Sequence, residues 1–215
     1  MRFYFDFISP FAYLANKRVH DLAARHNRAV ELVPIPFGVL LDHHGHKGPA
    51  EIESKRIYVF KQVSRIAARE GWRLTPPPAH PFNPILALAV ASVPGPNQRQ
   101  IVDTLFDAVW AGGPGVAQVE QIVNVLDAAG LSGQQAVAQG VEGRARVRAQ
   151  ATEAIAAGVF GVPTILVDRE LFWGVDAFRD IDAFLGGRDP VDLQGLQRWK
   201  DLPVGATRKA ASKAE

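Results

Sequence analysis

The chain has 215 residues, of which 47% are hydrophobic and 21% are charged, and its formal net charge is +2. Such a chain can bury a sizeable core, which excludes an intrinsically disordered protein. The longest apolar runs, such as Ile85 to Val93, are far shorter than the roughly 20 residues of a membrane-spanning helix. No dense basic stripe is present, so we expect neither a nucleic acid nor a membrane as partner.

The chain contains no cysteine. This excludes structural disulfides, internal redox cycling and thiolate metal sites. A strand pattern begins at Arg2 and leaves no room for a signal peptide, so we expect a cytoplasmic protein.

The N-terminal segment has the pattern of a strand, a helix and a second strand. Aromatic residues recur with a period of two, as in a strand, at Phe3, Phe5 and Phe7. Pro10 suits the first turn of a helix, with Ser9 as its N-cap. A second strand covers 30–33. This βαβ unit is typical of a parallel sheet.

Helical patterns replace strand patterns in the middle of the chain. Residues 42–49 form a polar, glycine-containing loop. Proline clusters then separate five predicted helices, which cover 51–70, 84–93, 99–111, 116–129 and 142–157. We expect residues 46–157 to form an inserted, all-helical subdomain.

The strand signal returns near the C-terminus. Residues 163–167 and 171–173 are predicted strands, joined by a turn at Asp168 and Arg169. A helix follows up to Leu185 and ends at Gly186 and Gly187. We therefore predict an α/β fold in which 1–45 and 158–200 form one domain around the insertion 46–157. We expect the tail, 201–215, to be disordered.

Ser9 is the first candidate functional residue. Its hydroxyl and the free N–H groups of the helix start favour an anion, and they would lower the pKa of a thiol held there. Because the chain has no cysteine, that thiol must belong to a ligand. The alternative interpretation is that Ser9 and Pro10 only cap a helix.

The segment at Val162 and Pro163 is the second candidate. If their peptide bond is cis, the main chain of Val162 would face a peptide-like ligand. The alternative is an ordinary proline at the first position of a strand.

Three histidines lie close together in the polar loop at His43, His44 and His46. They lack helical metal-binding spacing and a defined distant ligand, so we predict no metal site. Asn83 suits the cap of the helix that follows it. Lys55 and Arg56 suit a solvated helix face unless the fold turns them toward the site.

Four motifs in this order resemble the 2-hydroxychromene-2-carboxylate isomerases and the related kappa-class glutathione transferases. They are F-D-F-I-S-P-F-A-Y-L, G-x-K-G-P-A-E-I-E-S-K-R, G-V-F-G-V-P-T-I-L-V-D and F-W-G-V-D. The resemblance extends from Phe3 to about Leu185. It implies a thioredoxin-like fold of the DsbA/kappa type, with glutathione as cofactor and a homodimeric assembly.

The resemblance also assigns roles to the candidate glutathione site. Ser9 is implied as the catalytic hydroxyl beside the glutathione sulfur, with Pro10 and Phe11 in the same wall. Val162 is implied to contact the cysteinyl backbone of glutathione through its main chain. Val175 and Asp176 match positions that hold the γ-glutamyl end.

Further residues match positions beside the ligand and the substrate. His46 lies where relatives commonly have an asparagine, and Val175 lies where a polar residue is common. Lys55 matches a lysine that faces a carboxylate, and Asn83 is a second candidate contact for the substrate. The implied substrate is a small aromatic carboxylate.

The implied activity is glutathione-dependent isomerisation of a hydroxychromene carboxylate to trans-o-hydroxybenzylidenepyruvate by reversible thiolate addition. Two alternatives stay open. One is a kappa-class-like transferase that conjugates glutathione to electrophiles. The other is a non-catalytic module that binds glutathione or a peptide.

Overall fold

The computed structural model describes residues 1–206, apart from the side chains of residues 193 and 194. Its framework is a four-stranded sheet of strand order β2-β1-β3-β4. The strands are β1 Arg2–Phe5, β2 Glu31–Pro34, β3 Thr164–Val167 and β4 Glu170–Trp173. β1 and β2 are parallel, whereas β3 is antiparallel to both β1 and β4. The parallel opening is confirmed, but the sheet as a whole is mixed.

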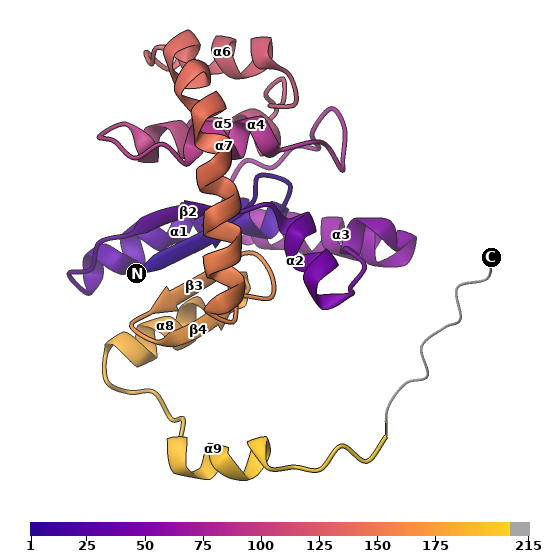
Figure 1. Ribbon diagram of the computed structural model, residues 1–215, viewed down its shortest axis with the longest axis vertical. Coiled ribbons are helices and arrows are strands. Elements are labelled where there is room, and N and C mark those ends of the chain that lie inside the picture. Colours follow the sequence, from indigo (N-terminus) through magenta and orange to yellow (C-terminus); the bar gives the residue numbers. More distant parts are fainter. Residues whose placement is uncertain (207–215) are drawn as a thin grey trace.

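Helices cover both faces of this sheet (Figure 1). Among them are α1 Pro10–Arg25, α2 Phe37–His44 and α8 Phe178–Leu185. Phe5 belongs to the hydrophobic cluster that includes buried residues of α1 and α8. Tyr4, the preceding residue, belongs to the cluster with α2 and the last turns of α7. Successive side chains of a strand point to opposite faces, so the aromatic run of β1 supplies both clusters.

A helical insertion separates β2 from β3. Its elements are η1 Pro49–Glu51, α3 Glu53–Glu70, α4 Ile85–Ala91, α5 Gln98–Trp110, α6 Val119–Ala128 and α7 Gly133–Ala156. In Figure 1, α4, α5 and α6 lie above the sheet, and α7 runs from them down to it. The predicted all-helical insertion is confirmed as part of the fold.

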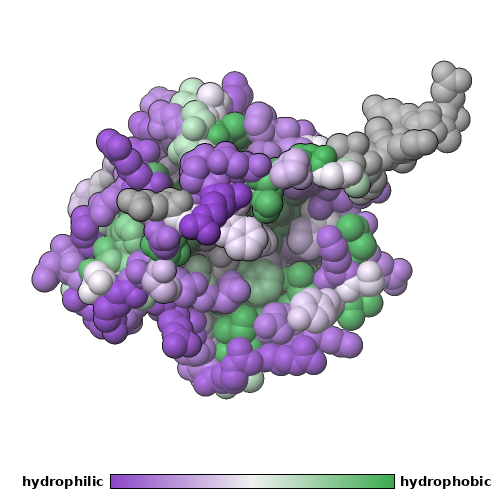
Figure 2. Space-filling model, turned by 90° about the horizontal axis from the view of Figure 1, so that it is seen from below, coloured by the Kyte–Doolittle hydropathy of each residue, from purple (hydrophilic) through white to green (hydrophobic). Residues whose placement is uncertain are grey.

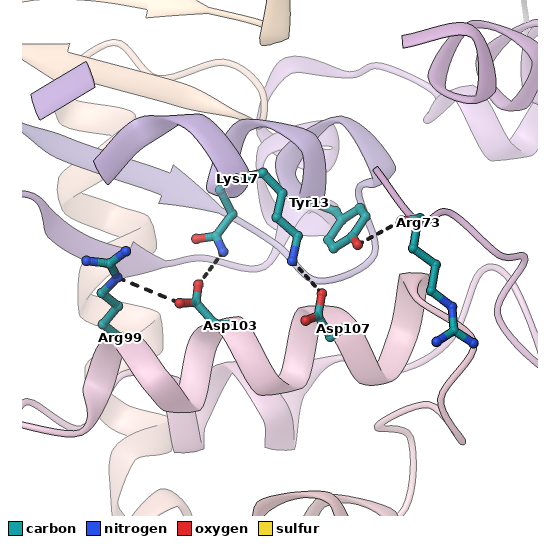
Figure 3. Close-up of polar contacts among 7 residues, drawn as sticks. Tyr13, Lys17, Arg73, Arg99, Asp103 and Asp107 are labelled. Atoms are coloured by element: carbon teal, nitrogen blue, oxygen red, sulfur yellow. Dashed lines mark hydrogen bonds and ion pairs between the residues drawn. The ribbon is translucent and has the colours of Figure 1, made fainter. Parts of the chain in front are cut away.

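Polar contacts join α1 to α5 (Figure 3). The Asn16 amide donates to Asp103 at 2.6 Å, and the Lys17 ammonium donates to Asp107 at 2.7 Å. The rings of Phe5 in β1 and Phe106 in α5 lie 5.4 Å apart. The insertion is therefore packed against the middle of α1 and against β1.

The start of α7 corrects the sequence prediction, which began this helix at Glu142. α7 begins at Gly133. Glycine has a low helix propensity, so the first turns of α7 were not predicted as helix. Two glycines of α7 lie close to α4: a Cβ on Gly140 would be 2.6 Å from Val90 Cγ2, and one on Gly143 would be 2.7 Å from the Ala89 carbonyl oxygen. They allow α7 to approach α4 closely.

α2 is a second correction, because the sequence predicted no helix there. Pro36 is the N-cap of α2, and Gly45 ends it with a φ of 63°. A proline at the start of a helix costs no hydrogen bond, because the first N–H groups of a helix have no partner within it. His43 and His44 accordingly lie in the last turn of α2, and the polar loop begins at Gly45 rather than at Asp42.

A C-terminal helix, α9 (Leu193–Lys200), was also not predicted and stands apart from the body (Figure 1). Val191, Trp199 and Leu202 in this arm are more than half exposed. Seen from below, hydrophobic residues mingle with hydrophilic ones around a hollow in the molecule (Figure 2). Of the tail predicted to be disordered, 201–206 contains no helix or strand. The rest, 207–215, lies outside the described residues.

Candidate functional site

The ends of all four strands that carry the candidate segments lie at one edge of the sheet. β1 and β2 are parallel, so their carboxyl ends lie at the same edge. Tyr4 pairs with Thr164, and Thr164 pairs with Trp173. The start of β3 and the end of β4 therefore lie at this edge as well. The segments that carry Ser9, Val162 and Val175 are brought together by this topology.

Ser9 caps α1, as predicted. Its Oγ accepts a hydrogen bond from the Ala12 N–H at 3.2 Å, and its side chain is nearly buried. Pro10 follows at the first helical position, and Phe11 is half-buried. The Phe11 N–H makes no hydrogen bond within residues 1–206. An unpaired N–H at a helix N-terminus favours an anion.

Asp6 organises the turn that leads into Ser9. Its Oδ1 accepts from the Ile8 N–H at 3.1 Å, its Oδ2 from the Phe37 N–H at 2.8 Å, and its carbonyl oxygen from the Ser9 N–H at 3.1 Å. Only 1% of Asp6 is exposed, and this burial raises its pKa to about 7. One carboxyl group thus joins the start of α2 to the turn before α1.

Asp6 was not predicted as a site residue, because in the sequence it fits the alternating pattern of the first strand. The sequence did contain a signal for it: an acidic residue inside an aromatic run, directly before a turn. A carboxylate buried in such a run requires hydrogen-bond donors, and the N–H groups of the turn can supply them.

The helical insertion also reaches this turn. The Trp110 indole N–H donates to the Phe7 carbonyl oxygen, and His80 Nε2 lies at the same distance, 2.9 Å, from the Ile8 carbonyl oxygen. His80 Nδ1 is buried and makes no hydrogen bond within the described part of the chain. Neither ring was predicted to contact the site.

The peptide bond between Val162 and Pro163 is cis. Val162 is buried, and its main-chain N–H and C=O form no hydrogen bond with any other described residue. The Pro163 carbonyl oxygen accepts from the Gly174 N–H at 2.9 Å. This bond holds the end of β4 beside the start of β3.

Val175 and Asp176 follow directly in the short helix η2 (Val175–Ala177). Val175 is buried in the same hydrophobic cluster as α1, and Asp176 is exposed. The structure therefore packs Val175 against the cluster that contains α1 and leaves Asp176 exposed.

The other predicted residues are not tied to Ser9 by any contact in residues 1–206. His46 is exposed just after α2. Lys55 is exposed on α3 and lines a shallow pocket of about 320 Å³ with Tyr58 and Val59. Asn83 accepts from the Ile85 N–H at 3.0 Å, but the N-cap of α4 is Pro84, so Asn83 lies one residue before the capping position expected of it.

Arg56, the neighbour of Lys55, affects the electrostatics of His80. Burial is the main cause of the lowered pKa of His80, and the charge of Arg56 lowers it further. Arg56 is therefore a basic group within electrostatic range of a side chain that contacts the site.

A separate concavity of about 500 Å³ lies on another flank, between α1 and α8. Its lining charges are largely paired with each other. Arg18 pairs with Glu70, and Asp182 pairs with Arg25 and His26. It lies beside Lys17 to Arg25 of α1, away from Ser9.

Neither a metal cluster nor a spanning helix occurs among the described residues. The rings of His43 and His44 lie 4.8 Å apart, and those of His44 and His46 lie 5.9 Å apart. No group of three or more acidic or histidine side chains in residues 1–206 is arranged to hold a metal ion. In the same part of the chain, no helix has the length and apolar composition needed to cross a membrane.

Comparison with known families matches residues 1–186 to the DSBA-like thioredoxin domain. Over 188 residues, the chain is 29% identical to a 2-hydroxychromene-2-carboxylate isomerase of Sphingobium xenophagum, which covers 85% of this chain and 96% of that protein. An isomerase of the same name from Pseudomonas putida is 27% identical over 188 residues, with coverage of 86% and 93%. A glutathione S-transferase kappa 1 of Caenorhabditis elegans is 21% identical over 207 residues, with coverage of 88% and 92%.

Two solved structures share the fold. A 2-hydroxychromene-2-carboxylate isomerase superposes with a TM-score of 0.78 at 24% identity, over 93% of this chain and 97% of that one. A probable DsbA oxidoreductase from Streptomyces coelicolor gives a TM-score of 0.59 at 19% identity, over 89% and 92%. The predicted thioredoxin-like fold of the DsbA type is confirmed.

Proposed function

Because the chain belongs to the DSBA-like thioredoxin domain family, we propose that it is a glutathione-dependent isomerase. Its substrate is 2-hydroxychromene-2-carboxylate or a similar intermediate of aromatic catabolism, and its product is a trans-o-hydroxybenzylidenepyruvate. Three relatives at 27–29% identity that carry this isomerase name support the proposal. The observation that carries it is Ser9, a nearly buried hydroxyl at the N-terminus of α1 in a chain without cysteine.

The groups at the sheet edge fit glutathione. The Ser9 oxygen already accepts from Ala12, which leaves its proton free to donate to a sulfur anion. The Phe11 N–H is a second free donor, and Pro10 and Phe11 would form the wall beside it. The main chain of Val162 would pair with the cysteinyl backbone, and the Asp176 carboxylate with the γ-glutamyl ammonium group.

Bound glutathione would supply a thiolate that adds reversibly to the conjugated enone, which turns the double bond into a single bond that can rotate before the thiolate is expelled. Ser9 and the N-terminus of α1 would stabilise the sulfur charge before addition and after expulsion. Lys55 would bind the substrate carboxylate, and His46 and Asn83 would contact the ligands from the loops after α2 and before α4.

An isomerase assay with and without glutathione tests this function. We expect product only when glutathione is present, with the glutathione recovered unchanged after many turnovers. Full activity of the glutathione-free enzyme would refute the thiolate mechanism.

A glutathione transferase is the second candidate, and the match to the kappa-class transferase of Caenorhabditis elegans favours it. Both reactions need the same thiolate, but transfer leaves the sulfur in the product. Mass spectrometry of the products distinguishes them: a transferase consumes one glutathione for each product molecule, whereas an isomerase consumes none.

A further inference from the structure

We propose that His80 and Trp110 of the helical insertion are positioning residues for Ser9, because they hold the two carbonyl groups of the turn that leads into it. The inference rests on the proposed function, since it concerns how Ser9 is held against the glutathione sulfur. It assigns the insertion a role in the chemistry of a site that lies at the edge of the sheet.

Two consecutive carbonyl groups in this turn are bound by ring N–H groups. Trp110 donates to Phe7, and His80 Nε2 contacts the carbonyl oxygen of Ile8, both at 2.9 Å. A carbonyl oxygen can only accept, so the Nε2 of His80 must carry the proton. These are the last two carbonyls before Ser9.

Asp6 holds the N–H groups of the same turn. It accepts from Ile8 with its side chain and from Ser9 with its main chain, both at 3.1 Å. Ile8 is therefore bound on both sides, by a carboxyl group at its N–H and by an imidazole at its C=O. The peptide units on either side of Ile8 cannot rotate without breaking one of these bonds.

The two rings are themselves fixed by packing. Trp110 is 1% exposed, and its ring lies 5.6 Å from that of His80. On the other side, the ring of Phe60 from α3 lies 5.3 Å from His80. Burial and the charge of Arg56 lower the pKa of His80, which favours the neutral ring with a single N–H donor.

Loss of a donor leaves the buried Phe7 carbonyl or the partly buried Ile8 carbonyl without its partner, which favours a shift of the turn toward other donors. Ser9 is the next residue, so its hydroxyl and the Phe11 N–H would move with the turn. Misplacement of a reacting group by about 1 Å can reduce a rate by about a hundredfold. The N–H groups of Trp110 and His80 therefore affect the ionisation of the glutathione sulfur without contacting it.

The experiment compares Trp110→Phe and His80→Phe, which keep an aromatic ring but remove the N–H donor. The pKa of enzyme-bound glutathione is followed by the ultraviolet absorbance of its thiolate as the pH is varied, alongside kcat and KM. We expect a raised thiol pKa and a kcat lowered by about tenfold or more, with a smaller change in the KM for glutathione. His80→Gln, which restores an N–H donor, should recover part of the loss.

Tyr13→Phe is the matched control. Its hydroxyl also donates to a main-chain carbonyl across the boundary of the insertion, that of Arg73 at 2.9 Å, but away from the turn (Figure 3). We expect this variant to lose stability in urea while its bound thiol pKa stays that of the wild type.

The outcomes separate the two proposals. If Trp110→Phe and His80→Phe lose only stability, as Tyr13→Phe does, the two rings are structural and the positioning role is refuted. If the wild-type protein does not ionise bound glutathione, the proposed function fails, and this role of the rings fails with it.

Discussion

The Ser9 side chain can act as a helix cap and as a donor to a ligand at the same time. Its oxygen accepts from the Ala12 N–H, and this bond does not use the hydroxyl proton. A bound anion would take that proton without breaking the cap. The stability of the protein therefore reports on the Ser9 oxygen as a cap, and its turnover reports on the Ser9 proton as a donor to the ligand.

Ser9→Ala removes both contacts. We expect the free energy of unfolding to fall by about 1 kcal/mol from the lost cap. We expect kcat to fall by roughly tenfold to a hundredfold, because a hydrogen bond to a charged group contributes about 1.5–3 kcal/mol. Urea denaturation and steady-state kinetics measure the two effects.

Ser132→Ala is the control for this variant, since Ser132 is the N-cap of α7 but its side chain makes no capping bond. It should change neither quantity. An unchanged kcat in Ser9→Ala would leave Ser9 with the capping role alone.

Asp6 makes stability depend on pH near neutrality. Its pKa is about 7 in the folded protein against 3.8 ordinarily, so between these values the folded state keeps a proton that the unfolded state releases. The stability contribution of this proton is present in full below pH 4 and is lost as the pH rises through 7. At 1.36 kcal/mol for each pKa unit, the loss is on the order of 4 kcal/mol.

Asp6→Asn should remove this decline, although the amide will change the overall stability because it cannot accept both N–H groups. The measurement is urea denaturation at a series of pH values from 4 to 8. Asp182→Asn is a control of opposite sign: the hydrogen bond to His26 and nearby positive charges lower the pKa of Asp182, so its contribution is lost as the pH falls. Parallel profiles for the wild type and Asp6→Asn would contradict the prediction.

At the scale of elements, periodic patterns predicted most of the fold. The alternation in β1 and the apolar spacing of α5 and α6 placed these elements within a few residues, because burial of one face imposes the pattern. α2 and the start of α7 were not predicted, because the proline before α2 and the glycines in the first turns of α7 have low helix propensities. Only tertiary contacts, such as Gly143 against α4, reveal why these residues are there.

The same limit applies to the site. Ser9 could be predicted from the sequence because its cap is a local signal. Its partners could not, since His80 and Trp110 lie far from it in the chain and only the packing of the insertion brings their N–H groups to the turn. The surroundings of a local motif are set by long-range contacts.

Gly143→Ala tests the packing of α7 on α4. Alanine favours an isolated helix over glycine by about 1 kcal/mol, but here its Cβ would lie 2.7 Å from the Ala89 carbonyl oxygen. We expect a net loss of about 1–3 kcal/mol in the free energy of unfolding, measured in urea.

Gly38→Ala in α2 is the matched control, because no atom of the described residues lies within 4 Å of its added Cβ. It should gain up to about 1 kcal/mol from helix propensity. Equal gains in the two variants would show that α7 and α4 can separate without cost.

At the scale of the whole molecule, the insertion and the sheet share one core. Phe5 and Phe7 of the sheet segment contact Phe106 of α5 at ring separations of 5.4 and 4.7 Å. α7 packs on α4 at one end and on the sheet at the other. Removing either part would expose the apolar surface of the other, so we expect the sheet layer and the insertion 46–157 to depend on each other for stability.

This shared core predicts a single unfolding transition. Far-ultraviolet circular dichroism follows mainly the helices, and near-ultraviolet dichroism follows the packing of buried aromatic rings such as Trp110 and Tyr4. Because these rings lie where the insertion and the sheet layer meet, both signals should change at the same urea concentration. For the same reason, a fragment of residues 46–157 should not fold cooperatively. Two separated transitions, in which the far-ultraviolet signal outlasts the near-ultraviolet one, would contradict this prediction. They would mean that the insertion is stable alone, and that the turn before Ser9 can lose its contacts while the insertion stays folded.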